Sequence, residues 1–146
     1  MPDPVAKRLG YALKRAQHAL RVRMDDVLRP LNLTAPQYAV LCAIEAETGI
    51  SNARLARTAF VTPQTMQGIL VNLERNGRLT RETDPTHGRV LRSRLTGLGQ
   101  ATLMQAHLRV QEIEDVMTAS VGREQVSHLA GVLSRCADDL TSTTTL

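Results

Sequence analysis

The chain has 146 residues, of which 42% are hydrophobic, 22% charged and 2% aromatic, and it contains no tryptophan. This length and composition fit one globular domain, or one domain with an appended dimerisation arm. The scarcity of aromatic rings argues against a module that stacks single-stranded bases, because such modules need several exposed rings.

The positive charge is concentrated in one part of the chain. The whole chain has a net charge of +4, whereas residues 51–95, with eight arginines and three carboxylates, have a net charge of +5. A local basic field of this kind is typical of proteins that bind a polyanion. Solvated arginines without a partner are the alternative.

The cysteines and the N-terminus indicate a reduced, cytoplasmic protein without a membrane partner. Cys42 and Cys136 are far apart and form no CxxC pair. The sequence contains no signal-peptide core and no apolar stretch long enough to span a bilayer. Cys42 lies in an apolar run that is predicted to be buried, which disfavours a redox-sensing role because a sensing thiol needs exposure.

Helical spacing of apolar residues predicts a long amphipathic helix from about Pro4 to Leu28, ended by Pro30. Within a small domain, such a leading helix has little to pack against. We therefore expect it to contact a partner subunit.

Three further helices are predicted from their capping residues. The first runs from Thr34, a good N-cap, to Gly49, and the next covers Ser51–Ala59 with Ser51 as its N-cap. The third begins at Thr62, which is followed by proline, and ends at Asn76–Gly77. The last two helices are joined by a short turn and therefore form a helix-turn-helix, whose second helix can enter the major groove of DNA.

Beyond Gly77 the helical pattern stops. Residues 79–83 and 90–95 are predicted strands joined by a turn at 84–89, and helical spacing returns from about Leu98 to Met117 and from Glu124 to about Leu140. The expected fold class is therefore mainly α with a small β-hairpin: a winged helix-turn-helix domain plus N- and C-terminal dimerisation helices. The chain (1–146) is expected to form a single domain, with residues 34–96 as the DNA-binding core, 4–30 and 97–140 as dimerisation helices, and 141–146 as a frayed tail.

The helix at Thr62–Asn76 has two different faces. Its apolar residues have the spacing of a stripe that packs on the domain, and they are Met66, Ile69, Leu70 and Leu73. Amides and hydroxyls that can read base edges occupy the other face, with Gly68 leaving room for close approach. The predicted DNA-binding residues are Ser51, Asn52, Arg54 and Arg75 for phosphates, Thr62, Gln64, Thr65 and Gln67 on the reading helix, and His87 and Arg89 at the hairpin tip. An ordinary exposed polar face is the alternative.

Motifs in a fixed order along the chain resemble those of the MarR family (multiple antibiotic resistance regulators). They are Leu33-Thr-Ala-Pro-Gln-Tyr-Ala-Val-Leu, Leu55-Ala, Val61-Thr-Pro-Gln-Thr-Met, Leu73-Glu-Arg-Asn-Gly, Asp84-Pro-Thr-His-Gly-Arg and Leu95-Thr-Gly-Leu-Gly. The resemblance covers nearly the whole chain. It implies a homodimer that binds a pseudo-palindromic operator, usually as a repressor, and is released by a small anionic or phenolic ligand.

The resemblance also implies a ligand pocket where the first, second and fifth helices meet, with Arg15 as anion partner and Tyr38 as ring-edge donor. Surface charge and core packing are the alternative roles of these two residues. The sequence departs from the family at the hairpin tip. His87 and Gly88 stand where the family's wing commonly carries an Asp and a first Arg, and only Arg89 is kept. The Asp that would orient the wing arginine in the family is therefore missing from this sequence.

Three other functions are weighed against this one. An enzyme is disfavoured, because the histidines are scattered and neither a nucleophile–base spacing nor a phosphate-binding loop is present. A metal-responsive regulator is the second, but His107 and Glu112 are five residues apart and do not share a helix face. The third is a winged helix used only for protein–protein contact. No cofactor or metal is expected.

Overall fold

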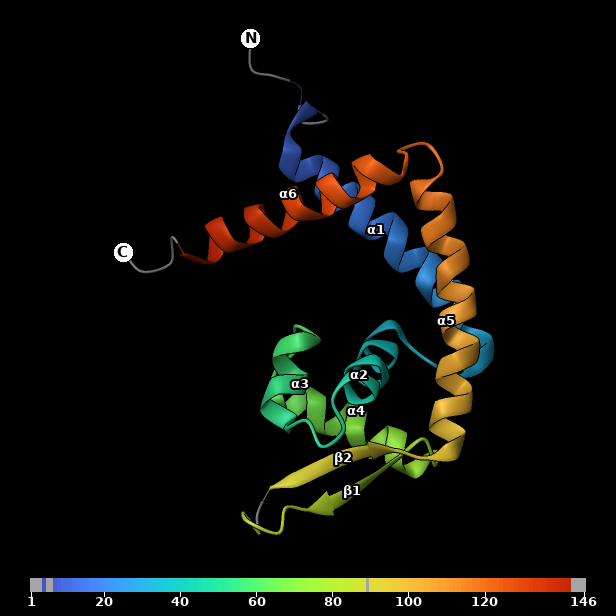
Figure 1. The fold of residues 1–146 in the computed structure, drawn as a ribbon, viewed down its shortest axis with the longest axis vertical. Coiled ribbons are helices and arrows are strands. Elements are labelled where there is room, and N and C mark those ends of the chain that lie inside the picture. Colours follow the sequence, from blue (N-terminus) through green and yellow to red (C-terminus); the bar gives the residue numbers. More distant parts are fainter. Residues whose placement is uncertain (1–3, 5–6, 89, 143–146) are drawn as a thin grey trace. The chain divides into compact units, whose positions relative to one another are not determined.

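The computed structural model describes residues 4, 7–88 and 90–142, and it confirms a mainly helical chain with one two-stranded hairpin (Figure 1). The described residues belong to two compact units, 1–110 and 111–146. In chain order the elements are α1 (Leu9–Leu28), a 3-10 turn (Arg29–Leu31), α2 (Ala35–Ala46), α3 (Asn52–Thr58), α4 (Pro63–Arg75), β1 (Leu79–Thr83), β2 (Leu91–Leu95), α5 (Gly97–Thr118) and α6 (Arg123–Ser142).

The three predicted N-caps are confirmed. Thr34 Oγ1 accepts from the backbone N–H of Gln37 at 3.2 Å, and the Gln37 side chain accepts from the Thr34 N–H at 3.0 Å, which completes a capping box. Ser51 and Thr62 likewise accept backbone N–H groups in the first turns of α3 and α4. These bonds satisfy donors that a helix start leaves free, so local chemistry fixes where the three helices begin.

One hydrophobic core holds the first unit together. It draws residues from α1 to α4, from β1 and from the first turns of α5, and its members that are fully inaccessible to solvent are Leu28, Leu41, Ile44, Met66, Leu73, Leu103 and Ala106. Three of the four apolar residues predicted to anchor α4 (Met66, Leu70 and Leu73) are buried, and Ile69 is half-buried. Burial of this stripe fixes which face of α4 points outward.

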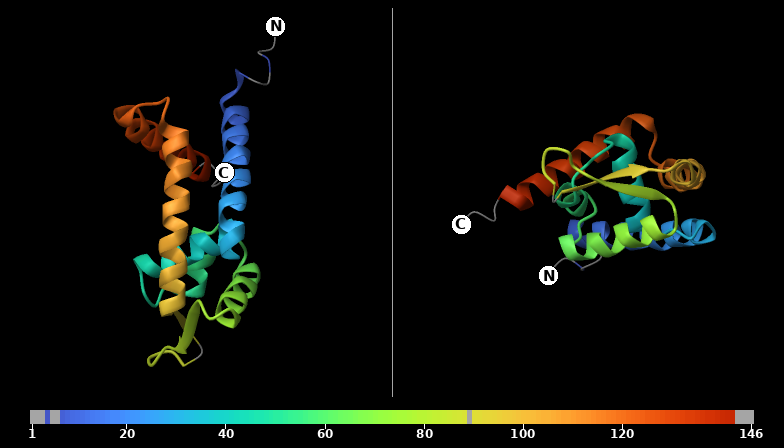
Figure 2. Two further views of the ribbon diagram at one scale, coloured as in Figure 1. Left: turned by 90° about the vertical axis from the view of Figure 1, so that its right-hand side faces the viewer. Right: turned by 90° about the horizontal axis from the view of Figure 1, so that it is seen from below.

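The hairpin pairs β1 and β2 antiparallel, with Leu79 opposite Leu95 and Thr83 opposite Leu91. The predicted first strand is confirmed, and the second begins one residue later than expected. A single bridge joins Ser51 to Arg92, so the start of α3 is attached to the hairpin. Figure 2 shows the hairpin extending beyond the helices of its unit.

The structure corrects the predicted start of the first helix and the predicted end of the last helix. α1 begins at Leu9 rather than near Pro4, and Arg8 provides no side-chain cap. Lys7 donates its backbone N–H to the Pro4 carbonyl at 2.8 Å. At the other end, Thr141 and Ser142 belong to α6 rather than to a frayed tail, and their hydroxyls bond to backbone carbonyls one turn earlier. Residues 143–146 lie outside the described part of the chain.

The long helices carry apolar side chains that the described chain does not cover. α6 contains no buried residue, and α1 buries only Leu28. Exposed large apolar residues include Leu9, Leu13 and Val22 on α1, Met104, Leu108 and Val116 on α5, and Leu129, Leu133 and Leu140 on α6. None of the described helices is long and apolar enough to cross a membrane.

Candidate nucleic-acid interface

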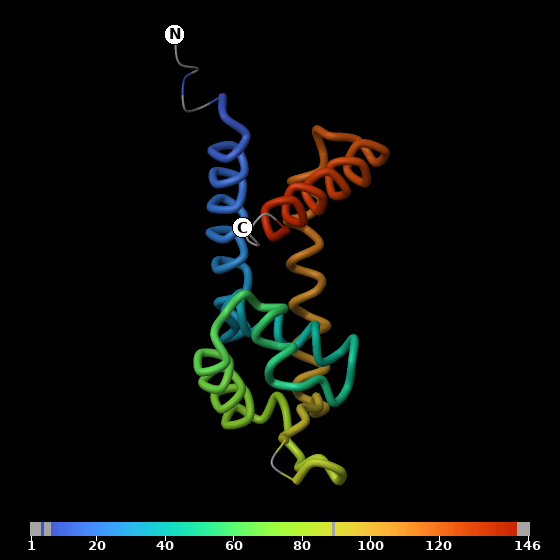
Figure 3. The backbone as a smooth tube through the Cα atoms, turned by 90° about the vertical axis from the view of Figure 1, so that its left-hand side faces the viewer, coloured from blue at the N-terminus to red at the C-terminus, as the bar shows by residue number. Residues whose placement is uncertain are grey.

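A tight turn joins α3 to α4 (Figure 3). Phe60 lies in this turn with a φ of 57°, in the left-handed region, and its side chain is 94% exposed. The backbone N–H of Val61 returns to the carbonyl of Ala56 at 3.0 Å. This bond closes the end of α3 and directs the chain into the N-cap of α4, which gives the two helices a fixed mutual angle.

The outer face of α4 lies opposite its buried stripe. At 3.6 residues per turn, Gln64, Gly68 and Arg75 fall on the side opposite Met66, Leu70 and Leu73, and all three are exposed. The structure thus presents Gln64 and Arg75 outward as predicted. The Arg75 side chain makes no hydrogen bond or ion pair among the described residues.

Gly68 has no role in the packing of the described chain. A Cβ atom built at this position would meet no atom of the described residues within 4 Å. Glycine inside a helix costs about 1 kcal/mol relative to alanine. The outer face of α4 therefore has a gap that the rest of the described chain does not need.

Two predicted reading residues flank this face and have partners within the chain. Thr65 receives a hydrogen bond from the Thr62 hydroxyl at 3.0 Å. Gln67 Oε1 accepts from Arg81 Nη1 of β1 at 3.1 Å, and Arg81 Nη2 also bonds to Glu74 of α4 at 3.3 Å. In the sequence, Arg81 contributed only to the net charge of residues 51–95, and its contact with α4 was not predicted.

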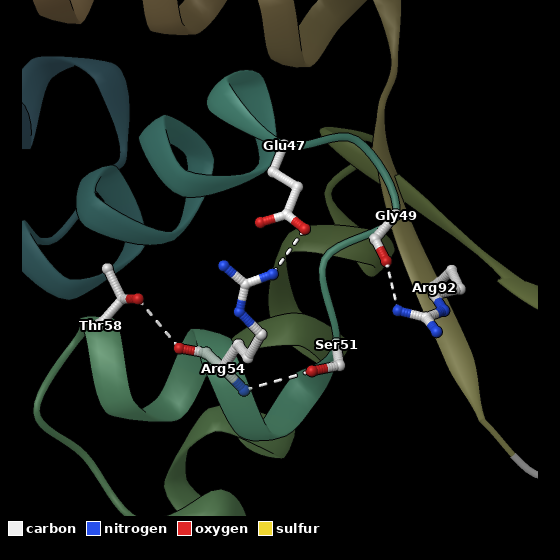
Figure 4. Close-up of polar contacts among 6 residues, drawn as sticks. All are labelled: Glu47, Gly49, Ser51, Arg54, Thr58 and Arg92. Atoms are coloured by element: carbon white, nitrogen blue, oxygen red, sulfur yellow. Dashed lines mark hydrogen bonds and ion pairs between the residues drawn. The ribbon is translucent and has the colours of Figure 1, made fainter.

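Three of the four predicted phosphate-binding residues, Ser51, Asn52 and Arg54, lie at the start of α3, whereas Arg75 ends α4. Figure 4 shows Ser51 and Arg54. Ser51 Oγ caps the helix by accepting from the Arg54 N–H at 3.4 Å, and the Arg54 guanidinium pairs with Glu47. Asn52 is half-buried, and its Oδ1 has no hydrogen-bond partner in the described chain. The ion pair was not predicted, because Glu47 lies in the preceding loop.

Asp84 organises the hairpin tip. Its carboxylate accepts from the backbone N–H groups of Thr86 and His87 at 2.8 and 3.3 Å, and from Arg92 Nε at 3.0 Å. These bonds, above all the one from Thr86, lower the pKa of Asp84. Arg92 also donates to the Gly49 carbonyl at 2.9 Å, which ties β2 to the loop before α3 (Figure 4).

Asp84, the residue directly after β1, therefore supplies a carboxylate that orders this turn. It does so although His87 replaces the acidic residue expected from the family pattern. The sequence feature that could have predicted this role is the Asp–Pro pair at the start of the turn, since an Asp side chain often accepts from the backbone N–H two residues on. His87 itself is exposed. The predicted minor-groove residue, Arg89, lies outside the described residues.

The two predicted ligand residues lie on different helices. Arg15 is exposed on α1, whereas Tyr38 is half-buried in α2. The Tyr38 hydroxyl hydrogen-bonds with His107 Nδ1 of α5 at 2.8 Å, and His107 Nε2 lies 3.1 Å from Glu45 Oε1. A hollow beside this group is lined by Glu45, Thr48, Arg94, Gln100, Met104 and His107.

Cys42 lies one helical turn from Tyr38. Burial, with a further contribution from Glu45, raises the pKa of its thiol, while a hydrogen bond with Tyr38 opposes this shift. A raised pKa leaves the thiol protonated, and only the thiolate reacts readily. Across the described part of the chain, no three His, Cys, Asp or Glu side chains are grouped to hold a metal ion.

The short turn between α3 and α4 and the paired β-hairpin that follows them define a winged helix-turn-helix protein. Residues 31–90 match the model of the MarR family. The chain is 34% identical over 131 residues to the HTH-type transcriptional repressor Rv2887 of Mycobacterium tuberculosis, covering 90% of this chain and 94% of the relative. The chain belongs to the MarR family.

Two solved structures have the same fold. The transcriptional repressor CouR bound to a 23-mer DNA duplex superimposes with a TM-score of 0.85 at 31% identity, covering 91% of this chain and 94% of that chain. Rv2887 in complex with salicylic acid gives a TM-score of 0.71 at 32% identity, with coverages of 92% and 98%. These similarities extend over the long helices as well as the winged helix.

Proposed function

We propose that this protein is a homodimeric transcriptional repressor that binds a pseudo-palindromic operator in duplex DNA and is released by a small aromatic or anionic ligand. Residues 34–96 form the DNA-binding core in this proposal, and residues 4–30 and 97–140 form the dimerisation helices. The role is regulatory rather than catalytic.

The observation that carries the proposal is the outer face of α4. Its exposed amide (Gln64) and guanidinium (Arg75) flank a glycine that nothing in the described chain requires, so an external surface has room to approach the helix backbone. The N-terminus of α4 adds N–H groups and the positive end of the helix dipole, which suit a phosphate. The repressor CouR, of the same fold, is bound to a DNA duplex.

Each DNA-binding residue has a place in this proposal. Gln64, Thr65 and Gln67 contact bases, Ser51, Asn52, Arg54, Thr62 and Arg75 hold phosphates, and His87 and Arg89 approach the adjacent minor groove. Before it contacts a phosphate, Arg54 has to exchange its ion pair with Glu47, which is half-exposed and therefore only weakly stabilising.

A homodimer is supported by the uncovered apolar residues of α1, α5 and α6. A helix such as α6, with no buried residue, gains too little from the rest of the described chain to be stable alone. A second copy would cover these side chains and would place two α4 helices in successive major grooves, about one helical turn apart.

The ligand is proposed to bind near Tyr38, with Arg15 as the partner of its anionic group. The relative Rv2887 has been crystallised with salicylic acid, an aromatic anion. The hollow beside His107 offers Arg94 as a second cation. The ligand acts only if it binds more tightly to the form of the dimer that does not fit the operator. Release by an effective ligand that survives both Arg15→Ala and Tyr38→Phe would contradict this site.

The proposed function is tested by selecting binding sites from random duplexes and measuring affinity for the selected site at two salt concentrations. We expect a palindromic consensus and an affinity that falls steeply with salt, because phosphate binding releases counterions. Absence of enrichment would favour a winged helix used for protein contact. Zinc-dependent affinity or thermal stability would favour a metal-responsive regulator.

A further inference from the structure

Arg81 connects the hairpin to the reading helix through a two-pronged contact. Its side chain is 10% exposed, and it donates from Nη1 to Gln67 Oε1 and from Nη2 to Glu74 Oε1. Gln67 and Glu74 are seven residues apart on α4, which places them on the same flank of the helix, facing β1. A buried, planar guanidinium with two acceptors has little freedom to turn.

The chemistry of this contact fixes the orientation of the Gln67 amide. Arginine has donors and no acceptor, so only the oxygen end of the amide can face it. The NH₂ end then points away from β1, and it has no hydrogen-bond partner in the described part of the chain. A glutamine without such a constraint can turn its amide to present either end.

We propose that Arg81 is a specificity-determining positioning residue that makes Gln67 a donor-only reader of the major groove. This inference rests on the proposed DNA-binding function. An unconstrained glutamine pairs with adenine by donating to N7 and accepting from N6. With Oε1 held toward β1, Gln67 selects bases that present only acceptors, which are guanine (N7 and O6) and thymine (O4).

The same contact neutralises Glu74. A carboxylate on the reading helix would repel DNA phosphates, and its partner is a cation that lies on the hairpin rather than on α4. Arg94 provides a matched control. It lies on the other strand of the hairpin, opposite Thr80, and among the described residues it makes no hydrogen bond or ion pair with α4.

The experiment measures affinities for the selected operator and for its single-base variants at one salt concentration. Gln67→Ala first identifies the base pair that Gln67 reads. At that position the wild type is expected to prefer guanine or thymine over adenine by roughly tenfold. Arg81→Met should reduce this preference to about threefold or less, or reverse it toward adenine, because the freed amide can then use both ends.

Arg94→Met removes the same charge from the same hairpin and should lower affinity for all sequences alike, without changing the preference. If thermal unfolding shows that Arg81→Met does not fold, Arg81→Lys is the variant that tests the inference. Lysine keeps the charge beside Glu74 but cannot hold Gln67 Oε1 and Glu74 Oε1 together as the arginine fork does. Arg81→Lys should lose most of the preference for guanine or thymine over adenine.

A wild-type preference for adenine, an unchanged preference in the folded Arg81 variant, or no effect of Gln67→Ala at any position would overturn the inference. Each of these leaves the proposed function standing, because the protein would still select and bind a site. Failure of the wild type to select any duplex would instead refute the proposed function.

Discussion

Replacement of Gly68 by alanine separates the stability of α4 from its proposed contact with DNA. The added Cβ meets no atom of the described residues within 4 Å, so the substitution has no steric cost within the chain. Alanine is favoured over glycine inside a helix by about 1 kcal/mol. For a chain of this length, a gain of that size raises the melting temperature by about 3 °C.

The effect on DNA binding should have the opposite sign. If the duplex approaches the α4 backbone at Gly68, a methyl group there keeps Gln64 and Arg75 from their contacts. Loss of about 1.4 kcal/mol from the binding free energy, the value of one or two weakened hydrogen bonds, lowers operator affinity about tenfold. A single methyl group would then stabilise the protein and weaken its function.

Thermal unfolding and titration of labelled operator, both at fixed protein concentration and salt, give the two quantities. Gly131→Ala in α6 is the matched control, because Gly131 is also helical and without neighbours within 4 Å in the described chain, and it lies outside the winged helix. The control should gain a similar amount of stability, which measures the helix-propensity effect of the substitution apart from the winged helix. A stabilised Gly68→Ala protein with wild-type affinity would refute the proposed close approach of DNA, and a destabilised one would refute the view that the chain does not need this glycine.

Three further substitutions test the fold around the site. Asp84→Asn should lower stability at neutral pH, and its difference from the wild type in denaturant unfolding should shrink as pH falls below about 4, because a carboxyl whose folded pKa is depressed stabilises only while ionised. Gly99→Ala should destabilise by about 3 kcal/mol, since its Cβ would lie 1.9 Å from the carbonyl oxygen of Arg78, a backbone atom that cannot turn aside as a flexible side chain can. Phe60→Asn should raise stability by about 1 kcal/mol, because asparagine tolerates the left-handed φ of 57° better than phenylalanine.

Each of these three predictions can be contradicted by a specific result. A pH-independent difference for Asp84→Asn would mean that the charge of this carboxyl does not order the hairpin tip. Gly97→Ala, in the same turn of α5 but in open space, is the control for Gly99→Ala, and equal effects of the two would rule out the clash. A less stable Phe60→Asn protein would indicate that Phe60 is covered by a second copy of the chain.

Local chemistry determined the element boundaries of the winged helix. The N-caps Thr34, Ser51 and Thr62 need only their own next turn, so they can be recognised from a few adjacent residues. The 3.6-residue period of Met66, Leu70 and Leu73 fixed the buried face of α4 and hence its outer face. The helix-turn-helix and the outward positions of Gln64 and Arg75 were therefore predictable.

The partners of the site residues depend on tertiary structure. Arg81 meets Gln67 across 14 residues and His107 meets Tyr38 across 69, and neither pair shares a helix period or a turn. Such contacts depend on how a strand or a helix packs on another element. The sequence alone does not distinguish Arg81 from the other arginines of the basic segment as the partner of Gln67. The sequence by itself determined which face of α4 points outward, whereas only the packing of β1 on α4 decided which end of the Gln67 amide is held against Arg81.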